Sequence, residues 1–116
     1  MRDKIEQRNH TTDCGVEATL EILGGKWKGV ILYQLRDELK RFNQLKRLLP
    51  KITQRMLTRQ LRELEHDGLI HREVYPQVPP KVEYSLTDSG KSLIPIIMLL
   101  KDWGDSNLLA EQAIQD

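Results

Sequence analysis

Apolar residues recur at helical spacing through most of this 116-residue chain. The first such stripe begins near Cys14, where Asp13 is in place to cap a helix, and it ends at Gly24 and Gly25. A second helix follows over roughly 26–36. Its broad apolar side is formed by Trp27, Val30, Ile31 and Leu35.

Two further helices separated by a proline come next. The first covers 43–49 and ends before Pro50, with an inward side of Leu45, Leu48 and Leu49. The second covers 53–67, where the Thr53 side chain can accept a hydrogen bond from a free N–H of the first turn. Its apolar side has the i, i+4, i+7 spacing of Leu57, Leu61 and Leu64. This order predicts a helix-turn-helix with 53–67 as its recognition helix.

The spacing of apolar residues changes to every second position after Gly68, which is expected to end the recognition helix. Two strands are predicted, near 70–75 and 82–86, and the prolines between them must lie in the loop because proline cannot donate to a ladder. A hairpin directly after a recognition helix is a wing, and Gln77 and Lys81 at its tip are expected to reach DNA. Residues 40–42 are a candidate for one more short strand.

The last helix, roughly 88–103 with Thr87 as its cap, is apolar on nearly all sides. It is either a central core helix or half of a subunit interface, and a chain of this length favours the second. The predicted contacts of a homodimer are Leu93, Ile96, Ile97, Leu100 and Trp103. A two-fold dimer places two recognition helices roughly 34 Å apart, one turn of DNA.

The predicted fold is mainly α with a small β-hairpin (α+β), a dimeric winged helix-turn-helix. A single domain over 1–116 is expected, with an N-terminal arm at 1–13, a winged-helix core at 14–86, and a dimerisation helix and tail at 87–116.

The net charge of +1 conceals a strongly basic segment. Residues 40–62 contain eight Lys or Arg and no Asp or Glu, which favours contact with a phosphate backbone. On the predicted recognition helix, Arg55, Arg59 and Arg62 lie with Thr58 opposite the leucines. A solvated basic face on an ordinary helix is the alternative.

Composition argues against several other classes. No apolar run approaches the roughly 18 residues of a membrane span, and the polar start is unlike a signal peptide, so a cytoplasmic protein is expected. The histidines at 10, 66 and 71 lack i, i+4 spacing, and Cys14 is the only cysteine. We therefore expect no metal site, no cofactor and no catalytic activity.

The chain resembles the HxlR-type winged helix-turn-helix regulators of bacteria, part of the MarR-like group. The resemblance rests on GGKWK at 24–28, on ITQRMLTRQLRELEHDGL at 52–69, on VYPQVPPKVEY at 74–84 and on LTDSG at 86–90. It runs from Cys14 to Trp103.

This resemblance implies a dimeric transcription factor that binds double-stranded DNA at palindromic operators. It places at the major groove Thr53, Gln54, Arg55, Thr58, Arg59 and Arg62, with Lys81 in the wing. Arg55 and Arg59 are the expected base readers, because arginine pairs bidentately with guanine. Phosphate contacts are expected from Lys46, Arg47, Lys51 and Arg62.

Cys14 stands where many members of that family carry a cysteine, and in some of them it senses electrophiles or oxidants. A thiol at a helix N-terminus has a lowered pKa, which makes it more reactive. An inert, semi-buried cysteine is the alternative, and Gly15 replaces the proline usual in the family.

A winged helix used only for protein–protein contact is the main rival function, although the wholly basic or polar recognition face favours DNA.

Overall fold

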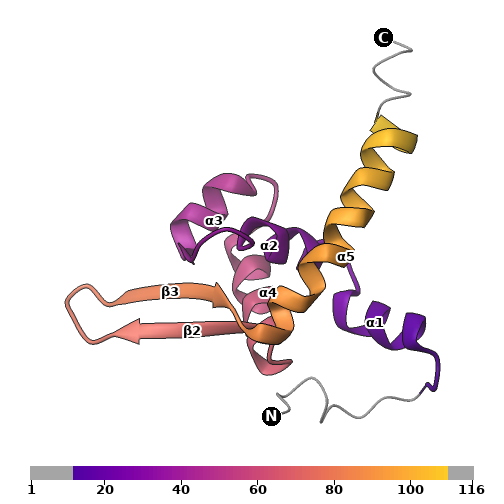
Figure 1. Ribbon diagram of the computed structural model, residues 1–116. Helices are drawn as coiled ribbons and strands as arrows, with labels where there is room; N and C mark the ends of the chain where they lie inside the picture. The colour runs from indigo at the N-terminus through magenta and orange to yellow at the C-terminus, as the bar shows by residue number, and fades with distance from the viewer. Residues whose placement is uncertain (1–11, 110–116) are drawn as a thin grey trace.

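The computed structural model describes residues 12–109. Its helices are α1 (Gly15–Leu23), α2 (Lys28–Gln34), α3 (Phe42–Leu48), α4 (Gln54–His66) and α5 (Asp88–Gly104), followed by a short π-helix over Asp105–Leu109. Its strands are β1 (Lys40–Arg41), β2 (Ile70–Tyr75) and β3 (Lys81–Leu86). This is the predicted winged helix-turn-helix (Figure 1). Most of the predicted N-terminal arm, with His10, lies outside the described residues.

Local capping explains where the recognition helix α4 begins and ends. The Thr53 hydroxyl accepts from the N–H of Met56 at 3.0 Å, which confirms the predicted cap. At the other end Gly68 has φ +78°, and the N–H of Leu69 reaches the carbonyl of Leu64 at 3.0 Å. This is a Schellman ending, which requires the left-handed backbone that glycine adopts without strain.

Helix α1 begins at Gly15, one residue later than predicted. The N-cap is Cys14 rather than Asp13, and the Cys14 N–H donates to the hydroxyl of Thr12 at 3.0 Å. The helix ends at the two glycines as predicted, with Gly25 at φ +86°.

The three strands form one antiparallel sheet in the order β1-β3-β2. Tyr84 of β3 is paired with Lys40 on one side and with Arg72 on the other, so the short strand predicted near residue 40 is confirmed. Tyr84 is buried, and Val82 and Leu86 pack against the same core. The predicted alternation therefore gives β3 one face toward the helices.

The core joins the inner sides of all five helices to the sheet. Leu57, Leu61 and Leu64 of α4 are at most 2% exposed, as their spacing predicted. One other prediction is wrong: Leu48, expected on the inward side, is 47% exposed. Val30, on the apolar side of α2, is 39% exposed. Helices α2 and α3 are only two turns long, so each buries a narrower stripe than a broad apolar side requires. Trp27 is partly buried against the core, with the Lys26 ammonium over its ring.

Helix α5 combines a core side with an exposed apolar side. Leu93 and Ile97 pack into this chain's own core, and Ile97 also lines an apolar hollow beside the helix, so a contact of either residue with a second copy stays a prediction. Ile96 is 46% exposed, Leu100 62% and Trp103 61%. Figure 1 shows the C-terminal half of α5 extending away from the other elements. Within residues 12–109, no helix is long and apolar enough to cross a membrane.

Candidate nucleic-acid interface

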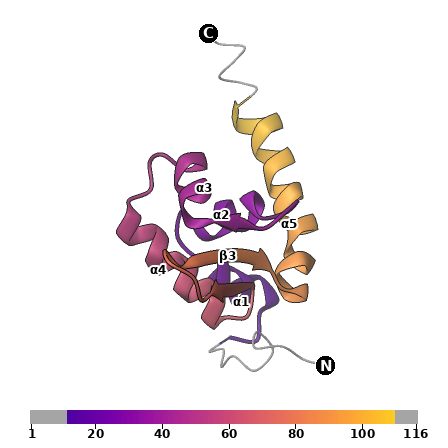
Figure 2. The same cartoon turned by 90° about the vertical axis from the view of Figure 1, so that its left-hand side faces the viewer.

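One side of the domain carries the elements expected to meet DNA. Figure 1 shows α3 and the hairpin at one end of the domain and α1 and α5 at the other, with α4 between them. In Figure 2 the recognition helix lies on the side away from α5. The sequence-predicted contacts on α3, α4 and the hairpin therefore belong to one part of the molecule, and the apolar row of α5 belongs to another.

The outer face of α4 is polar and open. A hollow of about 660 Å³ runs along it, lined by Gln54, Arg55, Thr58, Arg59, Arg62 and Glu63. Five of these six residues are predicted DNA contacts. The sixth, Glu63, is a carboxylate that sequence reasoning did not place at the site.

Two ion pairs meet at Glu63. Its Oε1 lies 2.8 Å from the Nζ of Lys28 on α2, and its Oε2 lies 3.1 Å from the Nε of Arg59 one turn earlier on α4. Lys28 is only 8% exposed, whereas the Arg59 side chain is 71% exposed. The hydrogen bond from Lys28, followed by the one from Arg59, holds the pKa of Glu63 below its usual range against the opposing effect of desolvation. Glu63 is therefore ionised at neutral pH.

The two threonines of the predicted contact set already have partners within α4. Thr53 accepts the capping hydrogen bond, and the hydroxyl of Thr58 donates to the carbonyl of Gln54 at 2.9 Å. Thr53 is exposed and Thr58 half-buried, so the oxygen of Thr58 still has capacity to accept a hydrogen bond. In this structure both hydroxyls therefore form hydrogen bonds with the backbone of the first turns of α4.

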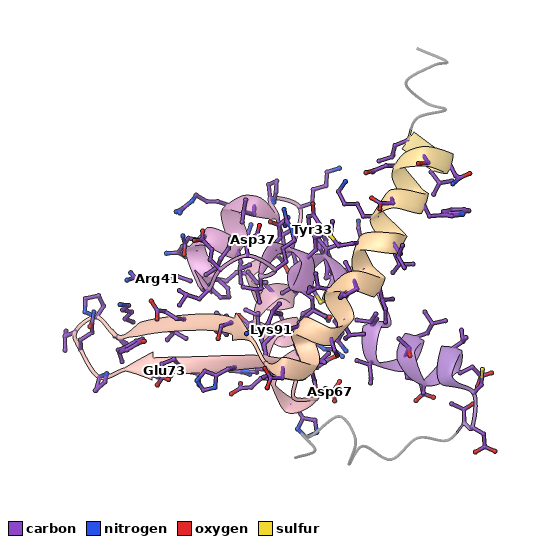
Figure 3. All side chains as sticks on the ribbon, in the orientation of Figure 1. Tyr33, Asp37, Arg41, Asp67, Glu73 and Lys91 are labelled. Carbon is purple, nitrogen blue, oxygen red and sulfur yellow. The ribbon has the colours of Figure 1, made fainter. Side chains whose placement is uncertain are left out.

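Several basic residues precede α4 along the chain. Lys46 and Arg47 lie in the last turn of α3, and Lys51 lies in the turn between the two helices. Lys46 is half-buried and the other two are exposed. Arg41, which was not among the predicted contacts, faces Glu83 in the sheet register and extends beside the hairpin (Figure 3). Positive charge thus extends from the sheet edge to the recognition helix.

The wing has less free charge than its sequence suggested. Gln77 is exposed at the tip, but the Lys81 ammonium lies 3.5 Å from a carboxylate oxygen of Glu83 and 4.7 Å from the centre of the Tyr75 ring. A hydrogen bond with Glu83 raises the pKa of Tyr75. Lys81 is therefore held against the hairpin, while Val78 at the tip is 99% exposed.

Cys14 is exposed at the start of α1 rather than semi-buried, and its reactivity stays a prediction. The backbone N–H groups of Glu17 and then Val16 lower the pKa of its thiol. The sulfur makes no capping hydrogen bond of ordinary geometry, so this is an electrostatic effect of the helix N-terminus. No group of His, Cys, Asp and Glu within residues 12–109 is arranged to hold a metal ion.

Comparison with known proteins gives the family. The chain matches the HxlR-like helix-turn-helix family over residues 22–112. It belongs to that family. The HTH-type transcriptional regulator YdeP of Bacillus subtilis (strain 168), itself uncharacterised, is 68% identical over 92 residues, which cover 79% of this chain and 72% of YdeP. The chain is thus a helix-turn-helix transcriptional regulator with DNA as its partner, and it is not an enzyme.

Two solved regulators have the same fold. The redox regulator HypR in its oxidised form is 63% identical, with a TM-score of 0.77, over 81% of this chain and 97% of HypR. The transcriptional regulator YodB of B. subtilis in its reduced form is 35% identical, with a TM-score of 0.71, over 84% of this chain and 96% of YodB. YodB has also been solved with a quinone bound.

Proposed function

We propose that this protein is a sequence-specific regulator that binds palindromic operators as a homodimer through helix α4. The observation that carries the proposal is the division of α4 into two faces. Leu57, Leu61 and Leu64 are fully buried, and the opposite face presents Arg55, Arg59 and Arg62 to solvent. A helix held in this way can enter a major groove with its guanidiniums against the base edges.

The exposed side of α5 supports a homodimer. Ile96, Leu99, Leu100 and Trp103 are all between 46% and 69% exposed on one helix. An apolar hollow of about 450 Å³ adjoins it, lined in part by Leu20, Leu23, Val30 and Tyr33. Exposed apolar surface of this kind on a small chain is typical of a subunit interface.

Cys14 supports a response to oxidants or electrophiles as the regulatory input. Its thiol is exposed and has a lowered pKa, the two properties that reactive cysteines share. HypR is a redox regulator and YodB binds a quinone, and both are similar to this chain. Since Cys14 is the chain's only cysteine, a disulfide would join two subunits or a subunit and a small thiol.

An operator selection tests the proposal. The purified protein is incubated with a random duplex library, with and without a quinone, and the bound DNA is sequenced. A palindrome with half-sites about one helical turn apart, bound by two chains, is the expected result. Quinone should abolish that binding for the wild type and not for Cys14→Ser.

Two results would contradict the proposal. No enrichment over random DNA at low salt would favour a winged helix that contacts other proteins. Enrichment by a monomer, unchanged when Leu100→Glu places a charge on α5, would remove the homodimer and leave DNA recognition intact.

A further inference from the structure

Glu63 connects the core of the domain to the face that meets DNA. One carboxylate oxygen contacts Lys28, which is buried in α2, and the other contacts Arg59, which is exposed on α4. A buried ammonium without a partner destabilises the folded state, so the ion pair with Lys28 favours the observed position of the Glu63 carboxylate. Lys28 therefore holds the carboxylate from the core side, and Arg59 contacts it from the exposed side.

The contact with Arg59 uses the part of the guanidinium that base reading does not need. Glu63 accepts from Nε at 3.1 Å. The two terminal nitrogens stay available, and they are the pair that can donate to the O6 and N7 of guanine. A carboxylate at Nε also limits rotation of a side chain that otherwise loses considerable rotamer freedom on binding.

We propose that Glu63 is a positioning and specificity-determining residue, which fixes the guanidinium of Arg59 for base reading and is itself fixed by Lys28. This inference rests on the proposed base-reading role of Arg59. Arg55 and Arg62 on the same face form no ion pair with any residue between 12 and 109, so among the described residues Arg59 alone of the three is held.

Glu63 also acts on DNA that lacks the preferred sequence. It places a negative charge on a face that approaches phosphates, and this repulsion weakens binding wherever no base contact compensates for it. The same carboxylate therefore improves discrimination in two ways: it orders the base-reading side chain, and it lowers affinity for random DNA.

The test measures binding to the selected operator, to operators changed at one base pair at a time, and to a random duplex. Glu63→Gln should lower discrimination at the base pair read by Arg59 by about tenfold, within the roughly 5- to 150-fold that an arginine–guanine pair provides. Discrimination at other base pairs should stay unchanged, and affinity for the random duplex should rise. Lys28→Met should show the same position-specific loss more weakly.

Glu65→Gln is the matched control, since it removes the same charge from the same helix two residues away. It should leave the profile over base pairs unaltered. Circular dichroism on each variant checks that the fold is retained. Glu63→Gln and Lys28→Met each remove one partner of the same ion pair, so a shared effect on base discrimination points to that pair.

The outcomes separate this inference from the function on which it rests. If Arg59→Ala removes preference at one base pair and Glu63→Gln does not, Glu63 has no positioning role and base reading by Arg59 stands. If Glu63→Gln weakens discrimination equally at every base pair, its role is structural and the inference is wrong. If Arg59→Ala itself changes no base preference, the base-reading role and this inference are both overturned.

Discussion

The hydroxyl of Thr87 donates to the carbonyl oxygen of Gly68 at 2.6 Å. The same hydroxyl oxygen accepts from the N–H of Gly90 at 3.1 Å, and the Thr87 N–H donates to the carbonyl of Leu69 at 3.1 Å. The first turn of α5 is therefore fastened to the residues that end α4. This junction sets the direction of the exposed apolar helix relative to the recognition helix.

Replacing Thr87 with valine should destabilise the protein by about 1–2 kcal/mol, because it removes the cap of α5 and the half-buried bond to Gly68. Urea unfolding measures the change. Thr19→Val is the control, since the Thr19 hydroxyl only donates to a carbonyl within its own helix. Equal losses for the two variants would show that the junction has no special importance.

Gly90→Ala should destabilise the same junction sterically. A Cβ at this position would lie 2.1 Å from the carbonyl oxygen of Leu69, so the backbone would have to move. Overpacking of this kind costs about 1–3 kcal/mol, against roughly 1 kcal/mol gained from the better helix propensity of alanine. Gly104→Ala on the same helix meets nothing within 4 Å and should be neutral or stabilising in thermal melts. The prediction is wrong if both variants melt above the wild type.

Arg59→Ala and Lys46→Ala should weaken DNA binding in different ways. Loss of Arg59 should cost about 1–3 kcal/mol on the operator and relax preference at one base pair. Loss of Lys46 should weaken binding to all sequences alike. It should also reduce the slope of log K against log salt concentration by about one. Fluorescence anisotropy titrations at several salt concentrations, on operator and random DNA, measure both. An equal loss on the two DNAs for Arg59→Ala would contradict base reading.

The contribution of Glu63 to stability should depend on pH. Its folded-state pKa is lowered, chiefly by the hydrogen bond from Lys28, so its stabilising effect is present above the ordinary value of 4.5 and is lost as the pH falls through the folded-state pKa. Urea unfolding of wild type and Glu63→Gln should therefore differ at pH 7, and the difference should shrink as the pH falls below 4.5.

Combining Glu63→Gln with Lys28→Met tests whether the ion pair between these two residues causes the pH dependence of stability. In a Lys28→Met background, Glu63→Gln should have a much smaller effect at pH 7, because the principal partner of the carboxylate is gone. A difference in unfolding free energy between wild type and Glu63→Gln that does not shrink below pH 4.5 would contradict the assigned ion pair.

The thiol of Cys14 should react at lower pH than an ordinary cysteine. Its pKa is lowered by the N–H groups of Glu17 and Val16, so thiolate forms earlier as the pH rises. Alkylation rates with iodoacetamide over pH 6–10 give the midpoint of thiol ionisation, and the urea-unfolded protein is the reference. A midpoint that does not shift on unfolding would show that the helix N-terminus has no effect on the thiol.

Local chemistry made most of the recognition unit predictable from sequence. The cap at Thr53, the leucine stripe of α4, the glycine ending at Gly68 and the hairpin closed by prolines all follow from the period of the pattern and from backbone rules. The family resemblance was equally accessible, because several motifs stand in order along the chain. Even the contact between Arg59 and Glu63 has a local signal in its i, i+4 spacing.

Only the tertiary structure decided which side of each apolar helix the core covers. Val30 and Leu48 are exposed although their spacing suits burial, and on α5 Leu93 and Ile97 enter the core while Leu100 does not. Periodicity shows that a helix has an apolar side, but the width that is buried depends on which elements lie against it. The pair of Lys28 and Glu63 has the same origin: no sequence spacing relates α2 to α4, and the two charges meet because the packing of the core brings those helices together.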